Sequence, residues 1–200
     1  LSCVLVPADT TGLSVSKSIE KMGLRTSPMA EVFLDGCRVP GSALLGTVGS
    51  GSMIFNLTMD VERLLVMAPA VGAMERLLER CVAHARERNI GTGPIGSHQA
   101  ISHPIANMEL DLETSRLALY RAAWRTQNHG TVTRESALAK LAVSEAYIRC
   151  CRTAMQVFGG YGYTIEYGVE RELRDALATT LYVGTSEVQR NLIAGLRGIR

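Results

Sequence analysis

The sequence predicts a mainly α chain, in which an antiparallel up-and-down bundle of the four-helix kind follows a short piece of antiparallel sheet. Of the 200 residues, 46% are hydrophobic and 20% are charged, which is typical of a globular protein. Strand-like runs broken by turn residues fill positions 1–46. From about residue 48 onward, hydrophobic residues recur every three or four positions, which is the periodicity of amphipathic helices.

The β-rich segment contains three short runs that favour strands, at residues 2–6, 13–16 and 30–34. Asp35-Gly36 is a turn signal, so we expect residues 30–34 to form a hairpin with a short return strand at 37–39. This segment is too small to hold a core alone, and we expect it to pack on further strands.

Three long helices, a short one and a terminal one follow. They are predicted at about 53–86, 98–128, 133–157 and 169–177, with a last helix after 184–186. Pro69 lies inside the first run and predicts a kink or a break. Thr133 or Ser136 could cap the third helix, and the glycines after Phe158 end it.

Composition argues against several classes of protein. Lys and Arg total 21 against 19 Asp and Glu, so the formal net charge of +2 gives no reason to expect nucleic-acid binding. No apolar stretch reaches the roughly 18 residues needed to span a membrane. The five cysteines include no CxxC and no metal-ligand spacing. They favour free thiols in a reducing compartment, which means the cytoplasm or the mitochondrial matrix.

Three segments carry residues suited to chemistry, and each also has a purely structural explanation. Residues 156–163 hold three glycines in four positions, which either admit a ligand close to the backbone or simply end a helix. Residues 184–187 open a helix, where free amides either bind an anion or receive an ordinary cap. Glu62, in residues 59–63, is either a desolvated base or a solvated surface residue.

Together these segments resemble the acyl-CoA dehydrogenase family of flavoenzymes. The match rests on Gln156-x-x-Gly159-Gly160-x-Gly162-Tyr163 and on residues 184–190, Gly-Thr-Ser-Glu-Val-Gln-Arg. The resemblance implies that residues 1–46 are the last strands of an antiparallel β-barrel domain and that residues 47–200 are the C-terminal helical bundle. It covers essentially the whole chain but only about the second half of a family member. We therefore expect the first half to supply much of the contact to the flavin ring.

The resemblance also implies an activity, the FAD-dependent oxidation of an acyl thioester to its trans-2-enoyl product. In most members the catalytic Glu directly precedes the Gly-Thr-Ser motif, but Val183 stands there in this chain. Isovaleryl-type and long-chain-type members carry it in the first bundle helix instead, in a motif matched by Met59-Asp60-Val61-Glu62-Arg63. Glu62 is therefore the expected base. A base on this helix also implies a pocket of a different shape from the medium-chain type, in which branched or bulky acyl groups are possible, and the acyl chain itself stays open.

Further roles are implied residue by residue. Arg88 resembles the Arg that contacts the flavin pyrophosphate across a subunit interface, and Gln99 resembles a flavin contact from the same loop. Asp60, Arg63 and Gly184 resemble thioester contacts. The cradle for a neighbouring subunit's adenosine is matched by Gln156, Val157, Phe158, Gly159 and Gly160, and the contact to the subunit's own FAD is matched by Thr185, Ser186 and Glu187. Such shared sites imply a homotetramer, and an electron-transfer flavoprotein is the expected electron acceptor.

Other readings remain open. Leu192-Ile193-Ala194-Gly195 lacks an Arg that some members have, so an acyl-carrier-protein thioester could replace the CoA thioester. An oxidase or monooxygenase of the same fold is a second alternative, because oxygen access depends on the pocket. A non-catalytic scaffold subunit is a third alternative, and the presence of Glu62 argues against it.

Overall fold

The structure is a computed structural model and describes residues 1–130 and 132–199. The chain divides into two compact units, Leu1–Met59 and Asp60–Arg200. Helix α1 (Gly51–Leu65) begins in the first unit and ends in the second. The domain boundary expected after residue 46 stays a prediction.

The first unit contains two small antiparallel sheets and a 3-10 turn, η1 (Gly41–Ala43). Strand β1 (Cys3–Val4) pairs with β4 (Leu44–Leu45), and β2 (Leu13–Val15) pairs with β3 (Val32–Leu34). The expected hairpin between residues 30–34 and 37–39 is wrong, because β3 pairs with the distant β2 and residues 37–39 form no strand.

A close backbone approach explains this pairing. The Asp35 amide donates to the Gly12 carbonyl over 2.9 Å, which extends the β2–β3 ladder. Gly12 has a φ of +90°, and a Cβ there would lie 2.0 Å from the Asp35 carbonyl oxygen. Only glycine can occupy this position, so Gly12 directs residues 32–35 back to β2.

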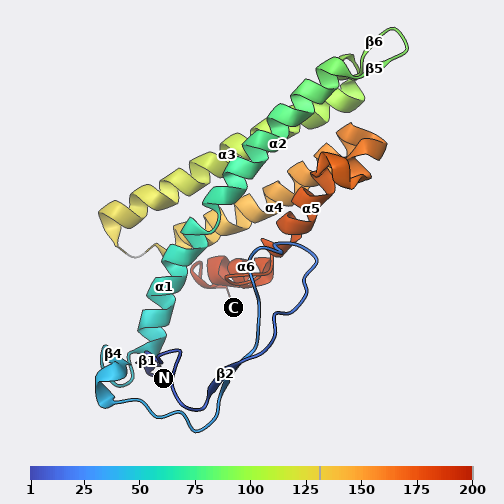
Figure 1. Cartoon of the computed structure of the whole chain (residues 1–200). Coiled ribbons are helices and arrows are strands. Elements are labelled where there is room, and N and C mark those ends of the chain that lie inside the picture. The colour runs from blue at the N-terminus through green and yellow to red at the C-terminus, as the bar shows by residue number, and fades with distance from the viewer. Residues whose placement is uncertain (131, 200) are drawn as a thin grey trace. The chain divides into compact units, whose positions relative to one another are not determined.

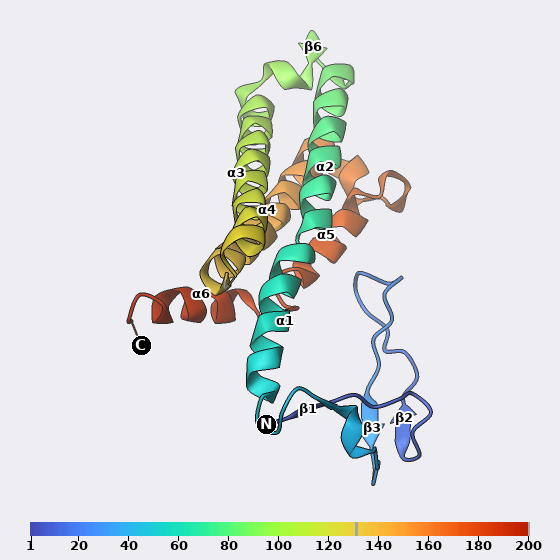
Figure 2. The same ribbon diagram turned by 90° about the vertical axis from the view of Figure 1, so that its left-hand side faces the viewer.

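The second unit is the predicted helical bundle (Figure 1). Its long helices are α2 (Ala68–Glu87), α3 (Gln99–His129) and α4 (Thr133–Phe158), and its short ones are α5 (Val169–Ala178) and α6 (Ser186–Gly195). Successive helices from α2 to α5 run in alternating directions. Figure 2 shows α2 and α3 side by side below the turn that joins them, which contains β5 (Asn89–Ile90), β6 (Gly93–Pro94) and η2 (Ile95–Ser97).

Helix α4 is the centre of this unit and packs against α2, α3, α5 and α6. Small side chains on its buried faces let the neighbouring helices approach closely. Two 3-10 turns, η3 (Gly159–Tyr163) and η4 (Ile165–Tyr167), connect α4 to α5. The core of the unit includes Met67, Met74, Leu77, Cys81, Met108, Leu112, Ala122, Val143, Ala146, Cys150, Cys151, Ala154, Val169 and Ala176.

The ends of the helices agree with most, but not all, of the expectations. The break expected near Pro69 occurs between α1 and α2, and Pro69 lies in the first turn of α2, where its missing amide costs little. Gly159, with a φ of +58°, ends α4 as expected. The cap expected from Thr133 or Ser136 is wrong, because Val132 is the N-cap residue and no side chain among the described residues caps α4. Both hydroxyls donate elsewhere, to Asp60.

All five cysteines carry free thiols, as predicted. Burial raises the pKa of Cys81 and Cys150 to about 12, so these two thiols are weak nucleophiles. Within residues 1–130 and 132–199, no helix combines the length and the apolar character needed to cross a membrane.

Candidate functional site

A groove of about 500 Å³ lies where α2 passes the end of α4. It is lined by five of the predicted cofactor residues, Arg88, Val157, Phe158, Gly159 and Gly160. The remaining lining residues are His84, Ile95, Tyr161 and Thr164. Segments far apart in the sequence thus line one groove.

The groove fits a nucleotide cofactor. A Cβ built on Gly159 or Gly160 would meet no atom within 4 Å, so bare backbone lines the groove at this point and a side chain would project into it. The Arg88 guanidinium lies 5.7 Å from the centre of the Tyr161 ring and remains exposed. A basic group beside a backbone cradle suits an anionic group joined to a flat ring, such as the pyrophosphate and adenosine of FAD.

Two predicted cofactor residues lie outside this groove. Gln99, in the first turn of α3, and Gln156, near the end of α4, are both exposed and do not line it. The flavin contact of Gln99 and the adenosine contact of Gln156 stay predictions.

A strained loop leads into α6. Val183 has a φ of +53°, an unfavourable conformation for a β-branched residue, and Gly184 follows with +89°. The buried Gln189 holds both residues, because its side-chain amide donates to the carbonyl of Val183 over 3.3 Å and to that of Gly184 over 3.0 Å. The positive φ of Gly184 favours glycine, and a Cβ there would also lie 2.7 Å from that amide nitrogen. The loop is therefore fixed by α6 itself.

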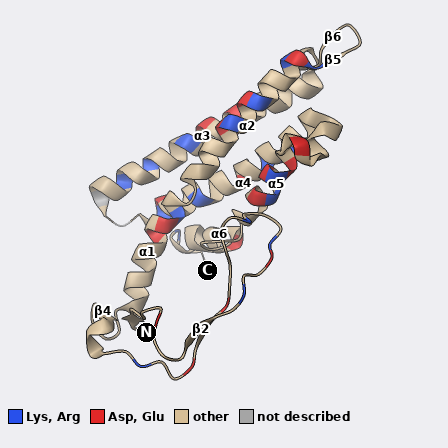
Figure 3. Ribbon diagram, in the orientation of Figure 1, with Lys and Arg blue, Asp and Glu red and all other residues tan. Residues whose placement is uncertain are grey.

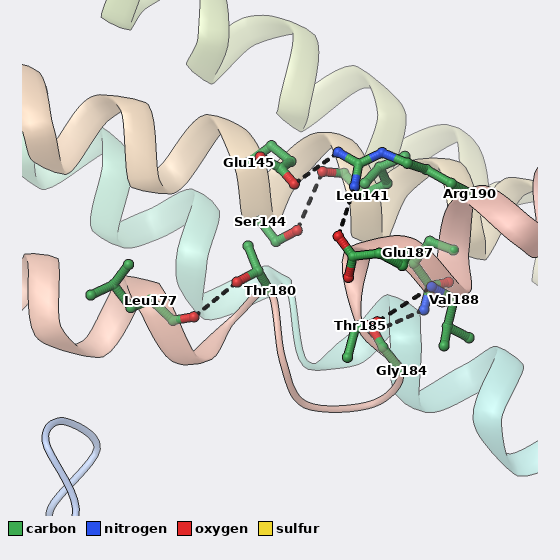
Figure 4. Close-up of polar contacts among 11 residues, drawn as sticks. Leu141, Ser144, Glu145, Leu177, Thr180, Gly184, Thr185, Glu187, Val188 and Arg190 are labelled. Carbon is green, nitrogen blue, oxygen red and sulfur yellow. Dashed lines mark hydrogen bonds and ion pairs between the residues drawn. The ribbon is translucent and has the colours of Figure 1, made fainter.

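The first turn of α6 uses Thr185 as its cap. Its hydroxyl accepts from the Val188 amide over 3.4 Å (Figure 4). The backbone amide of Glu187 and the Thr185 hydroxyl hold the pKa of the Glu187 carboxyl below its usual range. In the same view, Arg190 bridges Glu187 at 3.3 Å and Glu145 of α4 at 3.1 Å.

Ser186 differs from its neighbours in this turn. It is buried, and its hydroxyl has no partner among the described residues. A buried hydroxyl without a partner at a helix N-terminus is suited to a polar ligand group. Of the three predicted contacts to the subunit's own FAD, Ser186 is the one whose buried hydroxyl has no partner within residues 1–130 and 132–199.

Two acidic residues near the C-terminal end of α1, Asp60 and Glu62, lie in different environments. Figure 3 shows acidic and basic residues together at this end. Asp60 and Arg63 are 6% and 8% exposed, and the Arg63 guanidinium donates to the Asp60 carboxylate over 2.9 Å. Thr133 donates to the same carboxylate over 2.6 Å and Ser136 over 3.4 Å. Asp60 thus ties α1 to the first turn of α4.

Glu62 lies in a different environment from that buried pair. It is exposed, as are the apolar side chains of Val61 and Leu65 beside it on the helix. The Arg63 guanidinium pairs with Asp60 and does not neutralise the charge of Glu62. This agrees with the adjacent positions of Glu62 and Arg63 on a helix, where neighbouring side chains point in different directions.

Three polar residues of the second unit had no role predicted from the sequence, namely His84, Lys140 and Gln189. Lys140 is fully buried on α4, and its ammonium has no hydrogen-bond partner among the described residues. Burial lowers its pKa to about 8, against the attraction of Glu145 and Glu187. Nothing in the sequence marks Lys140, because its burial results from the packing of α4 against its neighbours.

A family model described as "Acyl-CoA dehydrogenase, C-terminal domain" matches residues 49–195. An L-prolyl-[peptidyl-carrier protein] dehydrogenase of Pseudomonas fluorescens is 42% identical over 97% of this chain and 51% of its own length. The mitochondrial short-chain specific acyl-CoA dehydrogenase of Mus musculus is 41% identical over 98% of this chain and 47% of its own length. The chain thus spans about half the length of these curated relatives.

Solved structures match equally well. The prolyl acyl carrier protein oxidase AnaB superposes with a TM-score of 0.98 at 40% identity, covering 99% of this chain and 52% of that protein. PigA, solved with FAD and proline, superposes with a TM-score of 0.97 at 33% identity, covering 100% of this chain and 52% of that protein.

Proposed function

Because the chain belongs to the acyl-CoA dehydrogenase family, we propose that the full-length protein is an FAD-dependent enzyme that removes two hydrogens from the α and β carbons of an acyl thioester. The observation that carries the proposal is that Asp60 and Glu62 differ in burial and in hydrogen bonding. Asp60 is buried and accepts three hydrogen bonds, whereas no described residue pairs with the Glu62 carboxylate. Position 183, where most members have the base, is a valine that cannot take a proton.

Glu62 is the proposed general base, which takes the α-proton of the acyl group. The α-proton of a thioester is only weakly acidic, so the carboxylate must be basic and close to it. Glu62 lies among the exposed apolar side chains of Val61 and Leu65. A substrate or a neighbouring segment that covers them would exclude water from the carboxylate and make it a better proton acceptor. Arg63 does not oppose this, because it remains paired with Asp60.

The proposed cofactor is FAD, which supplies the hydride acceptor when bound. Arg88 would hold the pyrophosphate, and the backbone of Gly159 and Gly160 would receive the adenosine. Ser186, at the start of α6, would offer its free hydroxyl to the subunit's own FAD. Gly184 would lie against the thioester. The homotetramer with shared flavin sites is part of the same proposal, since the resemblance assigns the two loops to different FAD molecules.

The carrier of the thioester is the second question, and one observation favours a carrier protein over CoA. The exposed groove along α6 is lined by Val188, Asn191, Leu192, Gly195 and Leu196 and includes no cation to hold the phosphates of CoA. The prolyl-carrier-protein dehydrogenase and oxidase among the similar proteins support the same choice. A prolyl or similar amino-acyl group on a carrier protein is therefore a candidate substrate.

The test is an anaerobic absorbance titration of the full-length holoenzyme with prolyl-carrier protein and, separately, with short-chain and branched acyl-CoA. We expect the flavin bands to bleach with one class of thioester. Glu62→Gln should keep the flavin spectrum and slow bleaching by about 10²–10⁴-fold, the usual contribution of a general base. Glu79→Gln, which changes an exposed carboxylate on α2, is the matched control and should bleach at the wild-type rate.

Each alternative has its own outcome. Bleaching by Glu62→Gln at the wild-type rate would refute Glu62 as the base. Peroxide formed in air without another acceptor would indicate an oxidase, whereas reduction of an added electron-transfer flavoprotein would indicate a dehydrogenase. A full-length protein that binds no flavin would refute the proposed function.

A further inference from the structure

His84 lines the same groove as Arg88 and the two glycines, and no role has been assigned to it. Its ring stacks on Phe158 with a centroid separation of 4.3 Å and an angle of 18° between the planes. His84 lies one helical turn before Arg88 on α2, and side chains at that spacing lie about 5–6 Å apart at Cβ. An anion that contacts Arg88 within the groove would therefore lie close to the imidazole.

The surroundings of His84 in the free protein favour its neutral form. Burial lowers the pKa of His84, and the positive charge of Arg88 lowers it further, while Glu87 acts in the opposite direction. Arg80, one turn earlier on α2, lies 5.7 Å from the centre of the Phe158 ring. From the other side of the groove, η3 contributes the aromatic ring of Tyr161, and the Tyr167 ring of η4 packs against the Tyr161 ring with a centroid separation of 5.0 Å.

We propose that His84 is a proton-linked binding residue of the cofactor groove, uncharged in the free protein and protonated when a dinucleotide pyrophosphate lies beside Arg88. The inference rests on the proposed function, because it takes FAD as the ligand. On binding, the imidazole takes one proton from solvent and its charge changes from zero to +1. The negative charge of the pyrophosphate offsets the repulsion from Arg88 and stabilises the imidazolium. The protonated ring also keeps a favourable position on the face of Phe158.

Thermodynamic linkage between protonation of His84 and binding of the anion makes this inference measurable. If the bound anion favours the protonated form of His84, then protonation of His84 must favour the bound anion by the same factor. FAD is a suitable probe, because neither its pyrophosphate diester nor its ring systems change charge near neutral pH. Any proton taken up on binding at that pH therefore comes to rest on the protein. Affinity should rise as the pH falls, by up to about tenfold per pH unit for one linked proton.

The experiment is isothermal titration of FAD into the full-length apoprotein, in two buffers of different ionisation enthalpy, at about pH 6, 7 and 8. His84→Phe keeps an aromatic ring against Phe158 but cannot titrate, and His84→Gln serves if the larger ring is not tolerated. His103→Asn, a change at an exposed histidine of α3, is the matched control. A second readout is the NMR chemical shift of the His84 ring as a function of pH, with and without FAD.

We expect the wild-type protein and His103→Asn to take up the same fraction of a proton and to bind FAD more tightly at low pH. Both His84 variants should still bind FAD, with the uptake and the pH dependence of affinity reduced. Unchanged proton uptake in both His84 variants would overturn the inference while leaving the proposed function intact. If the wild-type protein binds FAD with an affinity that does not change with pH, the inference is overturned and the proposed function is unaffected. No binding of FAD to the wild-type protein at any of these pH values would overturn both.

Discussion

The substitution Asp60→Ala tests whether Asp60 holds the fold together or contacts the substrate. The carboxylate is 6% exposed and accepts hydrogen bonds from Arg63 at 2.9 Å, Thr133 at 2.6 Å and Ser136 at 3.4 Å. Its removal leaves the Arg63 guanidinium, 8% exposed, without its charged partner. Breaking a buried ion pair in this way costs about 3–5 kcal/mol. The single hydroxyl proton of Ser136 can turn to the Thr133 carbonyl, 3.2 Å away, so Ser136 adds little to that loss.

The free energy of unfolding should therefore fall by about 3–5 kcal/mol, which lowers the melting temperature by roughly 10 °C for a domain of this size. The assay is thermal unfolding of the full-length protein, followed by far-UV circular dichroism. Hydrogen exchange at the first turn of α4 should accelerate in the variant, because Asp60 ties α1 to that turn.

Two further variants make the test specific. Asp60→Ala combined with Arg63→Met removes both charges, so it should recover most of the lost stability. Glu62→Ala, two positions away on the exposed side of α1, should change stability by less than about 0.5 kcal/mol. An unchanged melting temperature for Asp60→Ala, together with weaker binding of the acyl thioester, would refute this reasoning. Asp60 would then be the substrate contact that the family resemblance implied.

Three other outcomes follow from the same structure. Lys140→Met should leave the protein as stable as wild type or up to about 2 kcal/mol more stable, because it removes a buried, unpaired ammonium. Since folding lowers the pKa of Lys140 from 10.5 to about 8, wild-type stability should rise with pH across that interval, and urea titrations should show the rise weakened in the variant. Tyr147→Phe should cost about 1 kcal/mol in chemical denaturation, because it removes the 2.9 Å hydrogen bond to the buried Glu172; no loss would mean that water satisfies that carboxylate. Gly160→Ala should weaken FAD binding with little effect on stability, whereas Gly159→Ala should reduce both, because only Gly159 has a positive φ; equal melting temperatures for the two variants would contradict this.

Local patterns in the sequence determined the helices and their ends. Hydrophobic spacing placed the helices of the second unit to within a few residues, and Pro69 and Gly159 act through backbone constraints that need no partner. The family motif at residues 156–163 and 184–190 was also readable, because it depends on residue types at fixed spacing. The prediction of Glu62 as the base also depends on residue types at fixed positions, namely the motif at residues 59–63 and the valine at position 183.

Contacts between distant segments were decided only by the tertiary structure. Strand β3 pairs with β2 rather than with its nearest neighbour, because Gly12 permits a close approach that no local turn signal reports. Thr133 and Ser136 donate to Asp60, more than 70 residues away, so they do not cap α4 as their types suggested. His84 and Lys140 gain their properties from burial and from neighbouring charges. Burial and charge are properties of the packed bundle, so residue type and spacing alone could not identify these two side chains.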